Sequence, residues 1–325
     1  RQMCIRDRYS GVSSANRVLY QFENSTIEMN GKENYIAELK VARAFYYYLL
    51  LEAFGNVPII DRFDVPDGYL PATEPRSKVF EFVESELKNN INNLSEDVLN
   101  TYGRFNKWNA KMLLARLYLN AEAWIGTPMY NECENLCNEI IATNKYRLDG
   151  DYSLPFSTNN ELSNETMFVI PFDETKSGGQ IYMWARKTLH YSQMQTFNLQ
   201  ATWLDGGCVG VPTFFDNYIE GDKRLEKTWR MGQQYALDGT PLWTNGWCGD
   251  PQMLLSYTKD VTNISGDATM YQGYRFGKYE IKIGATGTPD NDYVIMRYAE
   301  VLMMKAECIL RTGGSSQEAA ELVNE

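Results

Sequence analysis

One stretch of the sequence, from Ala37 to Ile60, constrains the fold more than any other part of the chain. From Ile36 to Ala53, apolar residues recur at three- and four-residue steps along two different faces of a helix. A helix that is apolar on two faces must pack between neighbours on both of them. Gly55 is suited to the left-handed conformation that ends a helix, and Pro58 prevents the helix from resuming. We therefore expect a buried central helix that is followed by a sharp corner.

Three further helical patterns follow the central one. The first begins near Ser77, whose hydroxyl is suited to cap a helix N-terminus, and its apolar positions run from Val79 to Leu94. The second spans about residues 106–124 and is again apolar on more than one side, and the third spans about residues 130–144. Consecutive helices of this length, with small residues where neighbours approach, pack as antiparallel pairs in a solenoid-like array. A strict repeat of about 34 residues is absent.

The pattern changes after Leu148. From residue 149 to about residue 292 the chain is rich in Gly, Asn, Thr, Trp and Tyr and has no long helical period, although Met167–Pro171 predicts a single short strand. Helical patterning returns over residues 293–307. A connection this long without regular structure is usually functional. The sequence therefore predicts a mainly α fold with a long irregular, loop-rich insert and a few short strands.

Charge and hydropathy exclude two classes of protein. The net charge of −11 argues against a nucleic-acid partner, because a phosphate-binding surface needs clustered Lys and Arg. Hydrophobic residues make up 44% of the chain and charged residues 22%, as in globular proteins, and no apolar run approaches the ~20 residues that span a bilayer. We therefore expect neither a nucleic-acid-binding protein nor an integral membrane protein.

The two ends of the chain look unlike the rest. Residues 1–8 have neither an apolar segment nor an amphipathic period, and we expect a non-native or disordered leader there instead of a signal peptide. The other end stops at Glu325, partway through a helical pattern. We therefore expect the chain to be a piece of a longer protein.

Cysteine and histidine usage does not predict a metal site or a catalytic nucleophile. Cys133 and Cys137 share one helix face, but zinc needs four good ligands and the only histidine is His190, so both cysteines are expected to be small buried residues. Nothing in the sequence brings a Ser or Cys nucleophile near His190, which we expect to be a satisfied loop residue. Cys208 and Cys248 lie in the loop-rich part, where the sequence leaves a disulfide open.

Five blocks of the sequence, taken together and in this order, carry a resemblance to a known family. They are Tyr9 with Ala15–Leu19; Ala37–Leu39 with Arg43–Tyr47 and Phe54–Pro58; Gly103, Arg104, Lys107, Ala110 and Leu113–Leu119; Phe215, Asp216, Tyr218, Gly221, Asp222 and Arg224; and Arg297–Leu302 with Ala306 and Glu307. The blocks resemble the SusD/RagB family, which are glycan-binding outer-membrane lipoproteins of the nutrient-uptake and polysaccharide-utilisation systems of Bacteroidota. Trp108 and Asn109 stand where the family more often has small residues.

The resemblance implies a single SusD-like domain over residues 9–325. Within it we expect a helical N-terminal part over residues 9–148, an irregular ligand-binding part over 149–292, and returning helices over 293–325 that are truncated. The helices would form tetratricopeptide-like pairs that act as a scaffold. In such a scaffold Phe45, Tyr46, Tyr47 and Tyr48 are expected to serve mainly in packing.

The resemblance also implies a function. Family members sit on the extracellular face of the outer membrane, held by an N-terminal lipid anchor that we expect to be missing from this piece, and capture oligosaccharide for a SusC-like, TonB-dependent transporter. They are not enzymes, and no catalytic residue, metal or cofactor is expected. RagB-like members bind peptide, which is one alternative function. An α-helical glycosidase is a weaker alternative, because the sequence cannot show whether pairs such as Asp149 with Asp151 or Asp290 with Asp292 have the carboxylate separation that such an enzyme needs.

Aromatic residues in the insert give the candidate ligand site. Sugar rings stack on aromatic side chains, and their hydroxyls need amide, carboxylate or guanidinium partners. Five of the seven tryptophans, at positions 184, 203, 229, 243 and 247, lie in the irregular part. The candidate ligand-binding residues are Tyr69, Tyr182, Trp184, Arg186, Trp203, Trp243, Asn245 and Trp247.

Overall fold

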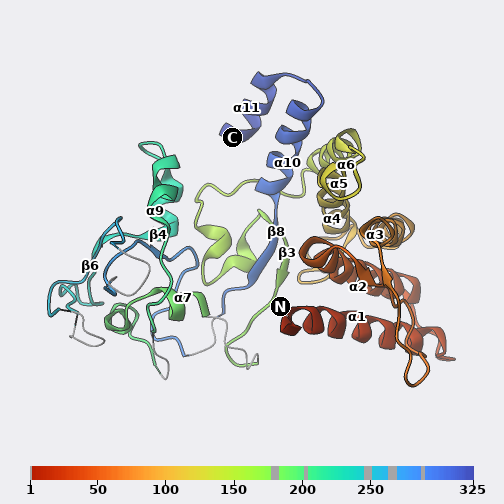
Figure 1. The fold of residues 1–325 in the computed structure, drawn as a ribbon, viewed down its shortest axis with the longest axis horizontal. Coiled ribbons are helices and arrows are strands. Elements are labelled where there is room, and N and C mark those ends of the chain that lie inside the picture. The colour runs from red at the N-terminus through yellow and green to blue at the C-terminus, as the bar shows by residue number, and fades with distance from the viewer. Residues whose placement is uncertain (1, 177–182, 201–203, 245–250, 263–268, 287–289) are drawn as a thin grey trace. The chain divides into compact units, whose positions relative to one another are not determined.

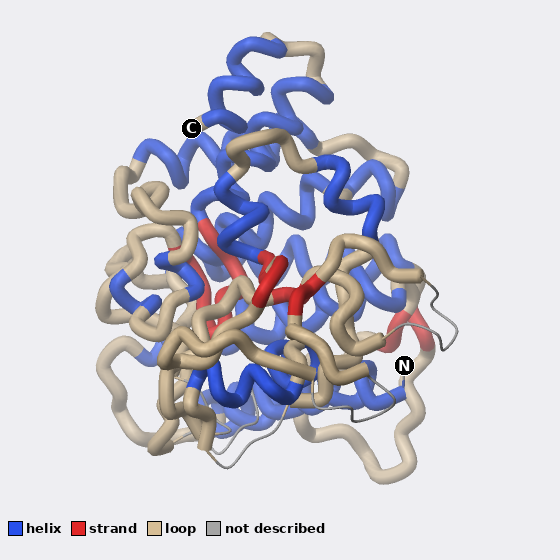
Figure 2. Tube along the Cα trace, turned by 90° about the vertical axis from the view of Figure 1, so that its left-hand side faces the viewer, coloured by secondary structure: helices blue, strands red, loops and turns tan. Residues whose placement is uncertain are grey.

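The computed structural model describes residues 2–176, 183–200, 204–244, 251–262, 269–286 and 290–325. Helices predominate among these residues, and the strands are short (Figure 2). The chain forms two compact units. The first, which we call the helical unit, comprises residues 1–148, 164–169 and 295–325, and the second, the loop-rich unit, comprises residues 149–163 and 170–294. The loop-rich unit therefore contains nearly the whole of the predicted irregular part.

The helical unit is built from helices that pack one against the next. They are α1 (Gln2–Glu23), α2 (Lys32–Phe54), α3 (Arg76–Asn90), α4 (Lys107–Leu119), α5 (Ala121–Ile125), α6 (Tyr130–Ala142), α10 (Tyr298–Arg311) and α11 (Ser316–Asn324), with the 3-10 turn η1 (Ile91–Asn93). Neighbouring pairs are α1 with α2, α2 with α3, α4 with α6, α6 with α10, and α10 with α11 (Figure 1). The predicted mainly α fold of helix pairs is confirmed.

Helix α2 is the central, two-faced helix that the sequence predicts. It contacts α1 on one side and α3 on the other, and Tyr47 and Tyr48 are buried in the core while Phe45 and Tyr46 are partly buried against it. Gly55 ends α2 with a φ of 74°, a left-handed value that favours glycine. On the α1 side, a Cβ atom at Gly11 would overlap the ring of Tyr46, so glycine is required at that helix contact. The expected packing role of these aromatic residues is confirmed.

The corner after α2 is held by buried polar side chains. The Tyr47 hydroxyl accepts a hydrogen bond from the Ile60 backbone nitrogen at 2.7 Å, and Tyr9 donates to the Pro58 carbonyl at 2.7 Å. Asn16 donates to the Ile60 carbonyl at 2.9 Å. Burial raises the pKa of Tyr47 to about 12, so this hydroxyl stays protonated through the physiological range. The corner leads into strand β1 (Val57–Pro58), which pairs antiparallel with β2 (Thr73–Glu74).

Several expected boundaries are wrong. Residues 1–8 were expected to be a non-native or disordered leader; residues 2–8 form the first turns of α1 and Ile5 packs against the core, so the disordered alternative is wrong. Helix α3 is preceded by Pro75 and not capped by Ser77, because proline is well suited to the residue position next to a helix start. The helix predicted over 106–124 is divided at Asn120 into α4 and α5.

The helical pattern that returns at residue 293 also begins differently. Residues 293–297 form strand β8 (Tyr293–Arg297), and α10 starts only at Tyr298. Strand β8 pairs with β3 (Thr166–Ile170), which confirms the strand predicted at Met167–Pro171 to within one residue. The apolar run of β8 is too short for its period to distinguish a strand from a helix, and the pairing with β3 decides the outcome.

The loop-rich unit consists of short elements joined by long connections. Its helices are α7 (Met183–Thr188), α8 (Met194–Phe197) and α9 (Lys223–Thr228), with 3-10 turns η2 (Leu154–Phe156), η3 (Asn160–Leu162), η4 (Tyr191–Gln193) and η5 (Pro212–Asn217). Strand β4 (Trp229–Arg230) pairs antiparallel with β7 (Arg275–Phe276), and β5 (Gly232–Gln233) pairs antiparallel with β6 (Ser256–Tyr257). Small apolar clusters around Leu189 and around Leu255 support these elements.

The cysteines and the helices bear on two sequence-based expectations, that the helical cysteines are buried and that the chain is not an integral membrane protein. Cys133 and Cys137 are fully buried free thiols, as expected, and Cys308 is buried as well. Cys208 is an exposed free thiol, and Cys248 lies outside the described residues. Within the described ranges, no helix combines the length and the apolar character needed to span a bilayer.

Candidate functional site

An exposed aromatic surface lies on paired segments of the loop-rich unit. Trp243 is 53% exposed, Tyr235 49% and Leu254 42%, and we call these three residues the Trp243 face. Trp243 lies opposite Leu254 in an antiparallel bridge. The neighbours Leu242 and Thr244 are buried, and since side chains alternate along an extended segment, their burial directs the Trp243 ring outward. An exposed indole with an apolar neighbour is a suitable surface for stacking a sugar ring.

The loop-rich unit also contains a polar pocket of about 410 Å³. We call it the β4–β5 pocket, and its lining residues are Glu226, Lys227, Trp229, Arg230, Met231, Gln233, Gln234 and Gly277. Two hydrogen bonds join it to the segment that carries Trp243. The Gln233 side-chain amide donates to the Leu242 carbonyl at 3.3 Å, and the Leu242 nitrogen donates to the Gln234 carbonyl at 2.9 Å. The stacking surface and the pocket are therefore neighbouring parts of one region.

Trp229 is held in the pocket wall by a cluster of aromatic rings. Its indole nitrogen donates to the Tyr218 hydroxyl at 3.1 Å. Its ring packs edge-on against Phe215, with ring centroids 4.9 Å apart, and against Phe276 at 5.9 Å. These contacts fix the orientation of the Trp229 ring and make the pocket wall rigid.

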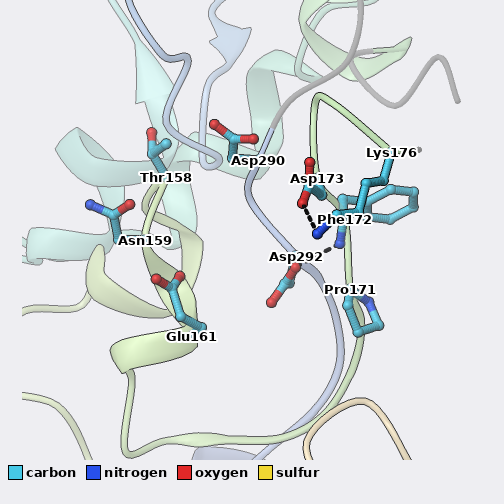
Figure 3. Close-up of a pocket in the computed structure, with 9 residues that line it drawn as sticks. All are labelled: Thr158, Asn159, Glu161, Pro171, Phe172, Asp173, Lys176, Asp290 and Asp292. Atoms are coloured by element: carbon cyan, nitrogen blue, oxygen red, sulfur yellow. Dashed lines mark hydrogen bonds and ion pairs between the residues drawn. The ribbon is translucent and has the colours of Figure 1, made fainter. Parts of the chain in front are cut away.

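A second pocket of about 660 Å³ is rich in carboxylates (Figure 3). This acidic pocket is lined by Thr158, Asn159, Glu161, Pro171, Phe172, Asp173, Lys176, Asp290 and Asp292. Figure 3 shows the segment of Thr158 to Glu161 on one side of it and that of Pro171 to Lys176 on the other. The pair Asp290 and Asp292, considered from the sequence as one of several carboxylate pairs, lies in this pocket.

The carboxylates of the acidic pocket are engaged in internal contacts. Asp290 accepts from the Lys282 ammonium at 2.6 Å and from the Glu174 backbone nitrogen at 3.0 Å, and Asp292 accepts from the Phe172 backbone nitrogen at 2.7 Å. The bond from Lys282 lowers the pKa of Asp290. Hydrogen bonds from Thr175 and Lys176 lower the pKa of Asp173 to about 2. These two side chains are therefore held in the ionised form and cross-link the surrounding segments.

Four of the candidate residues predicted from the sequence, Tyr182, Trp203, Asn245 and Trp247, lie outside the described residues. Trp184 and Arg186 belong to α7, and the Arg186 guanidinium lies 3.3 Å from the Asp205 carboxylate. Trp243 forms the exposed face already described, and Tyr69 is a 50% exposed residue of the helical unit. The eight-residue site stays a prediction.

The sequence-based prediction did not include the other residues of the Trp243 face and of the β4–β5 pocket. Tyr235, Arg230 and the two glutamines Gln233 and Gln234 were not among the candidates. A signal is present in the sequence, since Arg230 to Tyr235 places a guanidinium, two amides and an aromatic ring within six residues.

His190, expected from the sequence to be a loop residue, contributes to the local structure of a turn. It is fully buried, its backbone nitrogen donates to the Tyr257 hydroxyl at 2.9 Å, and its Nδ1 accepts from the Ser192 backbone nitrogen at 3.1 Å. These contacts place His190 at the start of η4, where it orders the turn.

The two units define a class of protein: a scaffold of paired helices whose long insertion carries surface pockets and exposed aromatic side chains. The chain belongs to the SusD family, whose model matches residues 138–325. Residues 5–119 match a second model, described as starch-binding and associating with the outer membrane. The resemblance stated from the sequence blocks is confirmed.

Individual relatives agree with this assignment. The chain is 24% identical to the starch-binding protein SusD of Bacteroides thetaiotaomicron over 321 residues, which cover 86% of this chain and 55% of SusD. A SusD superfamily protein from Parabacteroides distasonis has a similar fold, with a TM-score of 0.76, 22% identity, and coverage of 98% of this chain and 64% of that protein. Surface glycan-binding protein A from Bacteroides thetaiotaomicron, solved with laminarihexaose, gives a TM-score of 0.73 at 21% identity, covering 99% of this chain and 68% of that protein. The chain thus spans a little over half of SusD and less than two thirds of the Parabacteroides protein.

Proposed function

We propose that this chain is the glycan-capturing part of an outer-membrane nutrient-uptake protein, and that it holds oligosaccharide for a SusC-like, TonB-dependent transporter. The observation that carries the proposal is the Trp243 face, which lies beside a pocket lined by amides and a guanidinium. A sugar ring stacks its C–H face on the indole, and its hydroxyls bond to the polar groups of the pocket.

The relatives support this proposal through what they bind. SusD of Bacteroides thetaiotaomicron is named as starch-binding, and surface glycan-binding protein A of the same species was solved with laminarihexaose. The family description of association with the outer membrane supports a location there. The proposal extends this location to the extracellular face, with a lipid anchor on the complete protein.

The proposed role is capture without catalysis. A glycosidase needs one carboxyl group that stays protonated near neutral pH to act as the general acid, so its pKa must be raised. In the acidic pocket the pKa values of Asp173 and Asp290 are lowered by their partners. Screening the 325-residue chain on a glycan array, followed by product analysis of every oligosaccharide that binds, tests both parts: binding without shortened products is expected.

Replacing Trp243 by alanine should weaken oligosaccharide binding by about 1 kcal/mol or more, roughly fivefold, because the stacking surface is lost. The dissociation constant is measured by isothermal titration calorimetry with the best oligosaccharide from the array. Tyr20 is a matched control, since it is an aromatic residue of the helical unit with 41% exposure. Tyr20→Ala should leave the affinity unchanged, and an unchanged affinity in Trp243→Ala would remove Trp243 from the site.

A further inference from the structure

Arg230 in the β4–β5 pocket is a largely enclosed cation without a counter-charge. Its Nε atom is inaccessible to solvent and has no hydrogen-bond partner among the described residues. The Arg230 guanidinium lies over the ring of Phe197, whose centroid is 4.9 Å away, and it also interacts electrostatically with Tyr257. Burial lowers the pKa of Arg230, which means that the protein disfavours the charge and does not compensate it. A guanidinium nevertheless stays charged in proteins.

The arginine opposite Arg230 shows how backbone carbonyls can accept from the terminal nitrogens of a buried guanidinium. Arg275 pairs with Arg230 in the register of β4 and β7 and is 1% exposed. Its guanidinium donates to the carbonyls of Gly206 at 2.7 Å, Gln272 at 3.1 Å and Cys208 at 3.4 Å, and also to that of Met270.

The other charged groups of the pocket do not neutralise Arg230. Glu226 lines the same pocket but makes no ion pair with Arg230 within the described ranges. Lys227 contributes a second positive charge, and its nearest carboxylate, that of Asp151, is 3.9 Å away. Asp151 is thus the partner of Lys227, and Arg230 is the cation of the pocket that has no ion pair among the described residues. An anion that enters the pocket would supply the ion-pair partner that the Arg230 guanidinium lacks among the described residues.

We infer that the β4–β5 pocket holds the anionic group of an acidic sugar, either the carboxylate of a uronate or a sulfate ester, with Arg230 as its ion-pair partner. The inference rests on the proposed function, because it specifies the glycan that the Trp243 face and this pocket bind together. The neighbouring ring of the same oligosaccharide would stack on Trp243, since hydrogen bonds join the two regions through Gln233 and Gln234.

Pairs of oligosaccharides that differ only in charge test the inference. The probes are oligogalacturonate, oligoglucuronate and oligomannuronate, each compared with its own methyl ester, and a sulfated laminari-oligosaccharide compared with laminarihexaose. Hexaglutamate serves as the acidic peptide. Binding to the 325-residue chain is measured by titration calorimetry at two salt concentrations. At least one acidic sugar should bind about tenfold more tightly than its neutral counterpart, and the preference should shrink in high salt.

Two variants test Arg230 itself. Arg230→Gln should abolish the preference for the charged member of the pair and leave the affinity for the neutral member within about twofold. In Gly277→Ala, the new Cβ atom would lie 2.8 Å from the Arg230 Nε and 2.9 Å from its Cγ, so the guanidinium must move although its charge remains. This variant should lose the same preference. Arg224→Gln is the control, because Arg224 is exposed and already paired with Asp222 at 2.6 Å.

The outcomes separate the inference from the proposed function. A preference for sulfate over carboxylate that Arg230→Gln removes supports the inference and identifies the anion. Equal binding of charged and neutral sugars, or a preference that survives in both variants with unchanged thermal unfolding, overturns the inference alone. Failure of every sugar on the array to bind, or tight binding of hexaglutamate only, overturns the proposed function together with the inference.

Discussion

Replacing Arg43 by methionine should lower the free energy of unfolding of the helical unit by about 3–5 kcal/mol. Arg43 is buried in α2, and its guanidinium forms an ion pair with Glu86 of α3 at 2.6 Å. It also donates to the Asn16 side chain of α1 at 2.8 Å and to the Asp61 carbonyl at 2.5 Å. One side chain thus joins three helices to the corner after α2. Its removal leaves the carboxylate of Glu86, which is only 14% exposed, without its ion-pair partner, and this is the main source of the cost.

The pH dependence of this loss has a definite sign. Burial raises the pKa of Glu86, whereas the Arg43 guanidinium lowers it. Arg43→Met therefore lacks the group that favours the charged form of Glu86. The pKa of Glu86 should therefore be higher in the folded variant than in the folded parent chain. An acid whose pKa is higher in the folded than in the unfolded state destabilises the protein at pH values where it is ionised. As the pH falls and Glu86 takes up a proton, the difference between Arg43→Met and the parent chain should shrink.

Urea unfolding followed by far-ultraviolet circular dichroism measures this effect, because that signal comes mainly from the helices. Arg104→Met is the control, since the ion pair of Arg104 with Glu38 is more exposed and should contribute less than about 1 kcal/mol. Equal losses in the two variants would contradict the central role given to Arg43.

Local patterns were sufficient to predict the framework of the helical unit. The two-faced apolar period of α2 and the Gly55 to Pro58 stop depend only on neighbouring residues, and both are found as expected. Boundaries that depend on distant contacts were missed. Strand β8 forms because β3, more than 100 residues earlier, supplies its partner, which no local period reveals. Likewise, the polar contacts of Arg43 unite residues 16, 61 and 86, which are far apart in the sequence.

The ligand region was predicted less well because it too depends on contacts between residues that are distant in the sequence. Residue type alone suggested Trp243, but its exposure follows from the burial of Leu242 and Thr244 on paired segments. Arg230 and Arg275 are the same residue type with opposite surroundings, one lining a pocket and the other enclosed by carbonyls. Only the tertiary contacts distinguish an arginine available to a ligand from one that supports the fold.

Arg275→Met should therefore destabilise the loop-rich unit by about 2–4 kcal/mol, whereas Arg230→Met should cost no more than about 1 kcal/mol. Methionine at position 275 leaves the carbonyls of Gly206, Cys208 and Gln272 without their donor, and several unsatisfied acceptors outweigh the gain from removing a buried charge. Arg230 gives up its contact with the Phe197 ring and its electrostatic interaction with Tyr257.

Tryptophan fluorescence during urea unfolding measures this difference, since five of the seven tryptophans belong to the segment from residue 149 to 292. The transition of Arg275→Met should move to lower urea while that of Arg230→Met stays near the parent value. Because the carbonyls of Gly206 and Gln272 both accept from Arg275, this shift should be accompanied by weaker binding of charged and neutral oligosaccharides alike. If Arg230→Met were the more destabilised variant, Arg230 would be a structural residue, and the division of roles between the two arginines would be wrong.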